Sequence, residues 1–229
     1  MTAPGSDWWQ RPRRVHVVID NPSWILPFGE AFVASLNAGG DQAELCHSYD
    51  EMPEGEVAMF LGCIHIASSA VLQRHRYNLV VHESDLPHGR GFSPLTWQTI
   101  EGRTEIPICL LEAADEADAG VVYGRDTMQF GGHELIGEMR VVQAARTMTL
   151  CQGFLNEDNP PTGLPQKGVA SHYPRRRPVD SALDPNETLV AQFNILRTVD
   201  NERYPAYFDL HGHRYRLSVT KMDDSRDGQ

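Results

Sequence analysis

Short apolar runs alternate with helical patterns over residues 1–150, and this alternation limits the possible folds more than any other feature of the sequence. Strands are expected at residues 13–20, 42–48, 57–63, 78–82 and 105–113. Helices are expected at residues 23–40, 68–75, 93–101 and 133–154. Strands that alternate with helices form βαβ units. The sequence therefore predicts an α/β fold with a mostly parallel sheet and helices on both faces.

The last helical pattern of this region is long and amphipathic. Its apolar stripe is marked by Leu135, Met139, Val142 and then Ala145 or Arg146. We expect this side of the helix to pack against the sheet.

The composition of the chain changes after Cys151. Residues 156–180 are rich in Pro and Gly, which excludes regular structure for most of that stretch. A short helix at 186–200 and a hairpin at 206–219 follow, with His211-Gly212 as the turn. We therefore divide the chain into a main domain, 1–150, and a C-terminal extension, 151–229.

Charge and cysteine content exclude several functions. A formal net charge of −11 argues against nucleic acid as a partner, because phosphate-backbone binding needs clustered Lys and Arg. The four cysteines are widely spaced, and the Gly212 turn separates His211 from His213, so we expect no metal site. The sequence contains neither the apolar core of a signal peptide nor a run long enough to span a membrane, which predicts a cytoplasmic protein without a membrane partner.

Polar residues follow three of the predicted strands, where open parallel sheets bind ligands. Asn21, Ser23 and Trp24 follow the first strand, His82 ends the strand at 78–82, and Asp118 follows the strand at 105–113. A histidine and a carboxylate at neighbouring strand ends can form an acid–base pair. The alternative is a hydrogen-bonded histidine beside acids that cap helices.

The stretch "HESDLPHGRGFSPLTWQTIEGRTEIPICLLEAADEADAGVVYG" resembles the folate-dependent formyltransferases. It has their His-x-Ser-x-Leu-Pro pattern, Gly-rich turn, Trp-Gln helix and Asp-x-Gly loop. The likeness is greatest to small sugar N-formyltransferases of the pseudaminic-acid-pathway type. The segments "DNPSWILPF", "YPRRRPVDSALD" and "RTVDNERYPAYF" extend this resemblance to most of the chain.

The resemblance implies a Rossmann-like fold and formyl transfer from 10-formyltetrahydrofolate to a nucleotide-linked 4-amino-4,6-dideoxy sugar, a step of cell-surface polysaccharide biosynthesis. Residues 1–150 would then be the catalytic domain. The alternatives are another amine acceptor, methionyl-tRNA or glycinamide ribonucleotide, and an inactive folate-fold binding protein. The oligomeric state stays open, with a homodimer among the options.

The resemblance also assigns roles to residues. His82 and Asp118 match the catalytic pair of the family. The residues matched to the folate-binding walls are Leu61, Gly62, Cys63, Ile64, Ala113 and Asp115. The residues expected to contact the sugar nucleotide are Asn21, Ser23, Trp24, Ser84, Tyr173, Arg175 and Arg176.

The sequence departs from the family pattern at Val80, where the family usually has an asparagine two residues before the histidine. Such an asparagine donates a hydrogen bond to the developing oxyanion, a contact worth about 10²–10³ in rate. Asn21, Asn78 and His65 are the alternative donors in this chain, and a protonated His82 could carry more of the same task.

Overall fold

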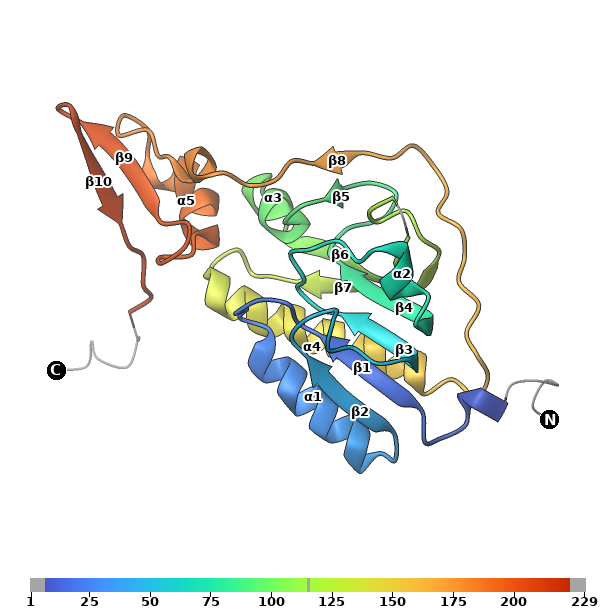
Figure 1. The fold of residues 1–229 in the computed structure, drawn as a ribbon. Coiled ribbons are helices and arrows are strands. Elements are labelled where there is room, and N and C mark those ends of the chain that lie inside the picture. Colours follow the sequence, from blue (N-terminus) through green and yellow to red (C-terminus); the bar gives the residue numbers. More distant parts are fainter. Residues whose placement is uncertain (1–6, 115, 223–229) are drawn as a thin grey trace, which may run out of the picture.

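The computed structural model describes residues 7–114 and 116–222, and a six-stranded sheet forms its centre (Figure 1). The strand order is β2-β1-β3-β4-β6-β7. The strands are β1 Arg14–Val18, β2 Gln42–Cys46, β3 Gly55–Phe60, β4 His75–His82, β6 Glu105–Glu112 and β7 Val122–Gln129. Pairing is parallel from β2 to β4, whereas β6 is antiparallel to both β4 and β7. The predicted α/β fold is confirmed, and its sheet has an antiparallel edge.

Two of the differences from the sequence-based expectation concern the central sheet and a helix that covers it. Strand β7 (VYGRDTMQ) was not predicted, because only Val122 and Met128 are buried and its polar sequence lacks an apolar run. The predicted helix at 68–75 shortens to α2, Ser69–Leu72. It ends there because β4 begins at His75, which pairs with Gly55 of β3.

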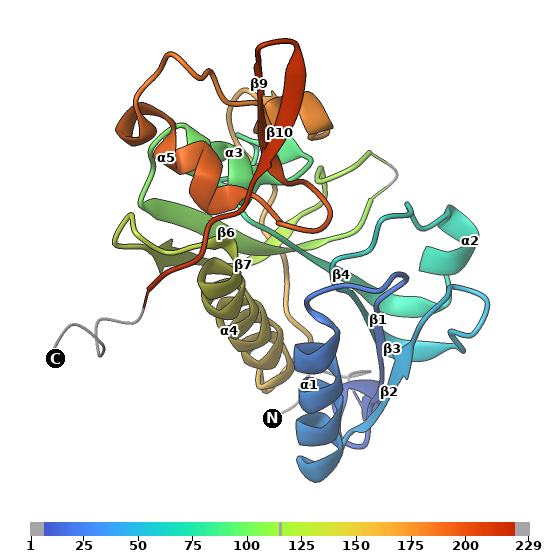
Figure 2. The same cartoon turned by 90° about the vertical axis from the view of Figure 1, so that its left-hand side faces the viewer.

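Helices cover both faces of the sheet. Helices α1 (Leu26–Ala38) and α4 (Ile136–Leu155) lie side by side on one face (Figure 2), and α2 lies on the other. Pro27 suits the first turn of α1 because that turn needs no backbone N–H there. Gly40, at φ +92°, follows its end in a conformation that favours glycine.

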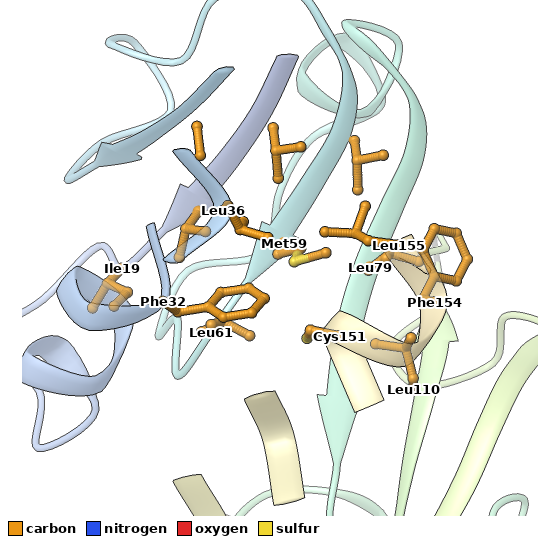
Figure 3. Close-up of a cluster of buried hydrophobic side chains, with 14 of the residues drawn as sticks. Ile19, Phe32, Leu36, Met59, Leu61, Leu79, Leu110, Cys151, Phe154 and Leu155 are labelled. Carbon is orange, nitrogen blue, oxygen red and sulfur yellow. The ribbon is translucent and has the colours of Figure 1, made fainter. Parts of the chain in front are cut away.

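The main core lies between the sheet and helices α1 and α4 (Figure 3). Phe32 of α1 and Phe154 of α4 pack against Met59, Leu79 and strand neighbours from β1 and β6. The opposite face has a smaller core under α2. These two layers hold the strand ends, and therefore the loops that follow them, in fixed positions.

The predicted apolar stripe of α4 is correct at Met139 but wrong at its C-terminal half. Ala145 and Arg146 are exposed, whereas Ala144 and Thr147 are buried. The predicted stripe was one position off at Ala144, and it passed over Thr147, whose side chain is small enough for close packing.

The C-terminal residues return along the molecule before they form a separate unit (Figure 1). Strand β8 (His172–Tyr173) pairs in parallel with β5 (Arg90–Gly91), near α3 (Pro94–Ile100). Helix α5 (Leu189–Thr198) and the hairpin of β9 (Ala206–Leu210) and β10 (His213–Leu217) share a small core. The two short 3₁₀ helices are η1, Asp7–Trp9, and η2, Pro178–Ser181.

The predicted hairpin turn is confirmed, since His211 and Gly212 both have positive φ, 53° and 79°. Within residues 7–114 and 116–222, no helix combines the length and apolar character that crossing a membrane requires.

Candidate active site

A cleft of about 560 Å³ lies beyond the carboxyl ends of β1, β3 and β4. This is the position at which parallel α/β sheets bind ligands. Residues 60–67 and 111–114 form one part of its wall, and α4 contributes another. The C-terminal extension also lines it through Arg175, Thr198, Asp200 and Tyr204, so the cleft draws on both parts of the chain.

His82 lies on this wall at the end of β4, where 5% of the residue is exposed. Its Nε2 is 2.7 Å from the carbonyl oxygen of Gly89. Its Nδ1 is 3.4 Å from Oδ1 of Asp118. The sequence therefore predicted correctly that His82 and Asp118 meet.

The reason they meet differs from the prediction. Because β6 is antiparallel to β4, Glu112 at its end pairs with Leu79, in the middle of β4, instead of lying beside His82. The loop after β6 must fold back to bring Asp118 to the histidine. Asp118 has a positive φ of 57°, a conformation that costs about 1–3 kcal/mol for a residue other than glycine.

Hydrogen bonds from distant segments hold Asp118 in this conformation. Its Oδ2 accepts from the backbone N–H of Gly91 at 2.9 Å, and its carbonyl oxygen accepts from Nε2 of Gln166 at 2.7 Å. Gly91 is required where it stands, because a Cβ there would lie 2.4 Å from the carbonyl oxygen of Tyr173. The carboxylate is thus fixed by β5 and by the Pro/Gly-rich segment.

Both ring nitrogens of His82 face oxygen acceptors. Nε2 lies within hydrogen-bonding distance of the Gly89 carbonyl oxygen, whereas Nδ1 makes a longer contact of 3.4 Å with the Asp118 carboxylate. A direct contact from either nitrogen to a substrate requires the ring to leave one of these partners. The Asp118 side chain is somewhat more exposed than that of His82, 13% against 6%.

Five residues predicted for the folate walls line the cleft, namely Leu61, Gly62, Cys63, Ile64 and Ala113. The sixth, Asp115, lies outside the described residues. Burial raises the pKa of the Cys63 thiol to about 12, so this cysteine is protonated at neutral pH and does not act as a nucleophile.

The predicted sugar-nucleotide set is only partly brought together. Trp24 lines the cleft, together with Arg175 and Arg176. The structure places the other four off the described wall: Asn21, Ser23, Ser84 and Tyr173.

These four residues have structural surroundings instead. Asn21 donates to the carbonyl oxygen of Gly62, and Tyr173 donates its hydroxyl to Glu101 at 2.9 Å while its ring stacks on Trp97. Ser84 is 2% exposed, and the carbonyl oxygen of Ser23 accepts a hydrogen bond from the backbone N–H of Leu26. Turn and strand-end position alone could not separate residues that brace a loop from residues that face a ligand.

Arg175 and Arg176 lie on the wall in different ways. The Arg175 guanidinium is 4.6 Å from the Phe92 ring centroid, a cation–π contact that leaves its edge open to a ligand. Arg176 donates to the carbonyl oxygen of Thr198 and to Oγ of Ser181, both at 3.0 Å, and burial lowers its pKa. Arg176 thus joins the Pro/Gly-rich segment to α5 while it lines the cleft.

Val80 lies on the cleft wall and packs against apolar neighbours from both sides of β4. Of the three suggested replacements for the missing asparagine, His65 lines the cleft, whereas Asn78 donates to the carbonyl oxygen of Leu72. His65 is held by Asp20, with 2.8 Å between Nδ1 and Oδ2.

Sequence reasoning missed a group of polar residues on the wall. Glu83 follows His82, and Arg140 and Gln143 project from α4 at helical spacing. A carboxylate directly after the strand-end histidine was a usable signal for Glu83. The α4 residues gave none, because polar residues on an amphipathic helix normally face solvent.

Comparison with known proteins identifies the class of fold. No protein-family model matches the chain. The solved methionyl-tRNA formyltransferase from Clostridium thermocellum superposes with a TM-score of 0.77 at 20% identity, over 93% of this chain and 95% of that one. A sugar N-formyltransferase from a Shewanella species gives 0.65 at 16% identity, over 91% and 98%. The chain has the fold of the folate-dependent formyltransferases.

One further solved structure and one curated sequence are also similar to this chain. HypX from Aquifex aeolicus, solved in complex with tetrahydrofolic acid, gives a TM-score of 0.70 at 16% identity, over 91% of this chain and 38% of that one. Among curated sequences, methionyl-tRNA formyltransferase from Streptococcus agalactiae is 26% identical over 189 residues, which are 76% of this chain. The match covers 59% of the length of that relative.

Proposed function

We propose that this protein transfers a formyl group from 10-formyltetrahydrofolate to the amine of a nucleotide-linked 4-amino-4,6-dideoxy sugar. The observation that carries the proposal is the His82–Asp118 pair on the wall of a deep cleft in a formyltransferase fold. The comparison with a sugar N-formyltransferase supports the acceptor class.

The apolar part of the cleft fits the proposed donor. Ile64 and Ile66 lie on the wall and are 58% and 74% exposed, beside the buried Leu61. Exposed aliphatic side chains at a cleft suit a flat heteroaromatic ring such as a pterin. When bound, the donor would supply a formyl group on a nitrogen that can leave as an amine.

The site residues account for the movement of charge and protons. Attack of the acceptor amine on the formyl carbon places negative charge on the formyl oxygen, and a cationic His82 close to it lowers the energy of that charge. The attacking nitrogen must lose a proton and the leaving nitrogen must gain one. In this proposal Asp118, 3.4 Å from the His82 ring, carries this proton from one nitrogen to the other.

The proposal is tested by single-turnover reactions with 10-formyltetrahydrofolate and a panel of acceptors. The panel contains dTDP- and UDP-linked 4-amino-4,6-dideoxy sugars, methionyl-tRNA and glycinamide ribonucleotide. Tetrahydrofolate release and the mass of the formylated product are measured. We expect tetrahydrofolate release in the presence of an amino-sugar nucleotide. If none of the tested acceptors causes release, the protein is not a formyltransferase.

Substitution of the pair tests its role. His82→Gln and Asp118→Asn are each expected to lower kcat by about two or more orders of magnitude, the usual contribution of a positioned acid–base group. Binding of tetrahydrofolate, followed by its fluorescence, should be retained. Turnover close to that of the wild type in either folded variant contradicts the assignment.

Methionyl-tRNA is the second candidate acceptor, because the curated relatives and one similar structure carry that name. The net charge of −11 disfavours it, since tRNA binding depends on basic surface. Product formed from methionyl-tRNA, and from none of the sugars, would establish this alternative.

A further inference from the structure

Glu83 is a carboxylate on the cleft wall for which the reaction above has no use. It follows His82 at the end of β4, and it lines the cleft together with residues of α4. Its Oε1 accepts a hydrogen bond from Nε2 of Gln143 at 2.6 Å, and its carbonyl oxygen accepts one from Nε2 of Gln98, also at 2.6 Å. Two helices, α3 and α4, therefore fix this residue.

The charge of the neighbouring His82 acts on this carboxylate, but no described residue forms an ion pair with it. Among residues 7–114 and 116–222, Glu83 forms no ion pair with Lys, Arg or His. The basic residue one turn before Gln143, Arg140, is paired with Asp200 at 3.1 Å. Buried charges in proteins are normally paired, so the arrangement leaves a place for a positive charge that comes from outside the chain.

The surroundings of Glu83 shift the pKa of its carboxyl group upward. Burial raises the pKa of its carboxyl group, the charge of His82 opposes this rise, and the charge of Asp118 adds to it. Gln143, from the α4 side, is neutral and stabilises the carboxylate by its hydrogen bond. A carboxyl group with a raised pKa is suited to exchange protons near neutral pH.

We propose that Glu83 binds the ammonium group of the acceptor in the cleft and removes its first proton, so that the amine becomes a nucleophile. This role rests on the proposed function. An ammonium nitrogen has no lone pair, and transfer of one proton to Glu83 leaves a neutral amine and a carboxylic acid. The amine then attacks the formyl carbon, the carbon–nitrogen bond of the donor breaks, and the second proton moves to the leaving nitrogen. Glu83 returns its proton to water after the product leaves.

The competing interpretation is that Glu83 only holds α4 against β4 through Gln143. The variant Glu83→Gln separates the two roles. A glutamine has the same shape and can still accept from Gln143 through its amide oxygen, but it has no negative charge and takes up no proton. A purely structural role therefore predicts normal activity for this variant.

The test measures kcat/KM for the amino-sugar nucleotide from about pH 6 to about pH 9, with wild type, Glu83→Gln and the control Glu44→Gln, whose residue is exposed on β2. We expect Glu83→Gln to lose about a hundredfold at pH 7, with unchanged tetrahydrofolate affinity. Its kcat/KM should rise about tenfold per pH unit up to the pKa of the substrate amine, because this variant can use only amine that is already neutral. Glu44→Gln should follow the wild type.

Two results overturn the role of Glu83 while leaving the proposed function intact. One is an active wild type with an equally active Glu83→Gln variant. The other is a loss of activity by the same factor at every pH, which would show a disturbed site and not a missing base. A wild type that transfers formyl to no acceptor overturns both proposals together.

Discussion

The buried pair His16 and His75 should make the stability of this protein sensitive to mild acid. The two side chains lie on β1 and β4 at the end of the sheet opposite the cleft, where they are 3% and 7% exposed. Nδ1 of His16 is 2.6 Å from Nε2 of His75, so one ring donates to the other. Burial is the main cause that lowers the pKa of both rings, that of His75 from 6.5 to about 4.

The sign of the effect follows from proton binding in the two states. Between about pH 6.5 and pH 4, His75 binds a proton in the unfolded chain but not in the folded one, so the free energy of unfolding falls as the pH falls. Each unit of pKa difference corresponds to about 1.4 kcal/mol. The full shift of His75 is therefore worth about 3 kcal/mol, and the loss levels off below about pH 4.

Urea unfolding of wild type and His75→Gln at about pH 7 and about pH 4.5 measures this contribution. A glutamine amide can still donate to His16 but does not titrate. We expect the variant to lose about 2–3 kcal/mol less than the wild type between the two pH values. His47→Gln, at an exposed position, is the control and should behave as the wild type. Equal losses in wild type and His75→Gln would refute this reasoning.

Three further substitutions test the framework of the site. Gly120→Ala should lower turnover strongly, because its Cβ would lie 1.8 Å from the carbonyl oxygen of Glu112 and would displace the loop that carries Asp118. The control Gly137→Ala, whose Cβ would have no atom within 4 Å, should keep full activity in the same assay. Arg176→Gln should lower the melting temperature, because it removes charge-assisted hydrogen bonds worth about 1.5–3 kcal/mol each. An unchanged melting temperature would mean that Arg176 contributes to substrate binding and not to stability. Val80→Asn should lower the free energy of unfolding in urea by about 1–3 kcal/mol, because an amide replaces a packed apolar side chain. An unchanged free energy of unfolding would show that the asparagine amide reaches water in the cleft.

The sequence predicted the parts of the fold that depend on apolar runs and turn chemistry. Strand β3 is a continuous buried run, and the His211-Gly212 turn has a local cause, so both could be recognised without tertiary information. Strand β7 could not, because it is half-exposed and polar and exists by pairing with β6. Strand direction was also beyond a single sequence, which is why β6 was assumed to be parallel.

The candidate site was predictable where a residue ends a buried strand, and much less so elsewhere. His82 is fixed by its place in β4, and the family resemblance supplied Asp118 in a loop whose path the sequence does not define. Tyr173 and Arg176 have the residue types of a nucleotide site, but their bonds to Glu101 and to the Thr198 carbonyl oxygen could not be predicted. Composition does not show which partner a polar side chain finds.

The parallel pairing of β5 with β8 has a consequence for the synthesis of the protein. All six strands of the sheet, together with α1 and α4, are complete once residue 155 has been added. The brace on Asp118 from Gln166, the bond from Gly89 N–H to Ser171 Oγ and the β8 pairing come later. A nascent chain therefore contains all the residues of the sheet, α1 and α4 before it contains the residues that brace Asp118. The order of translation separates the acquisition of stability from the acquisition of catalytic geometry.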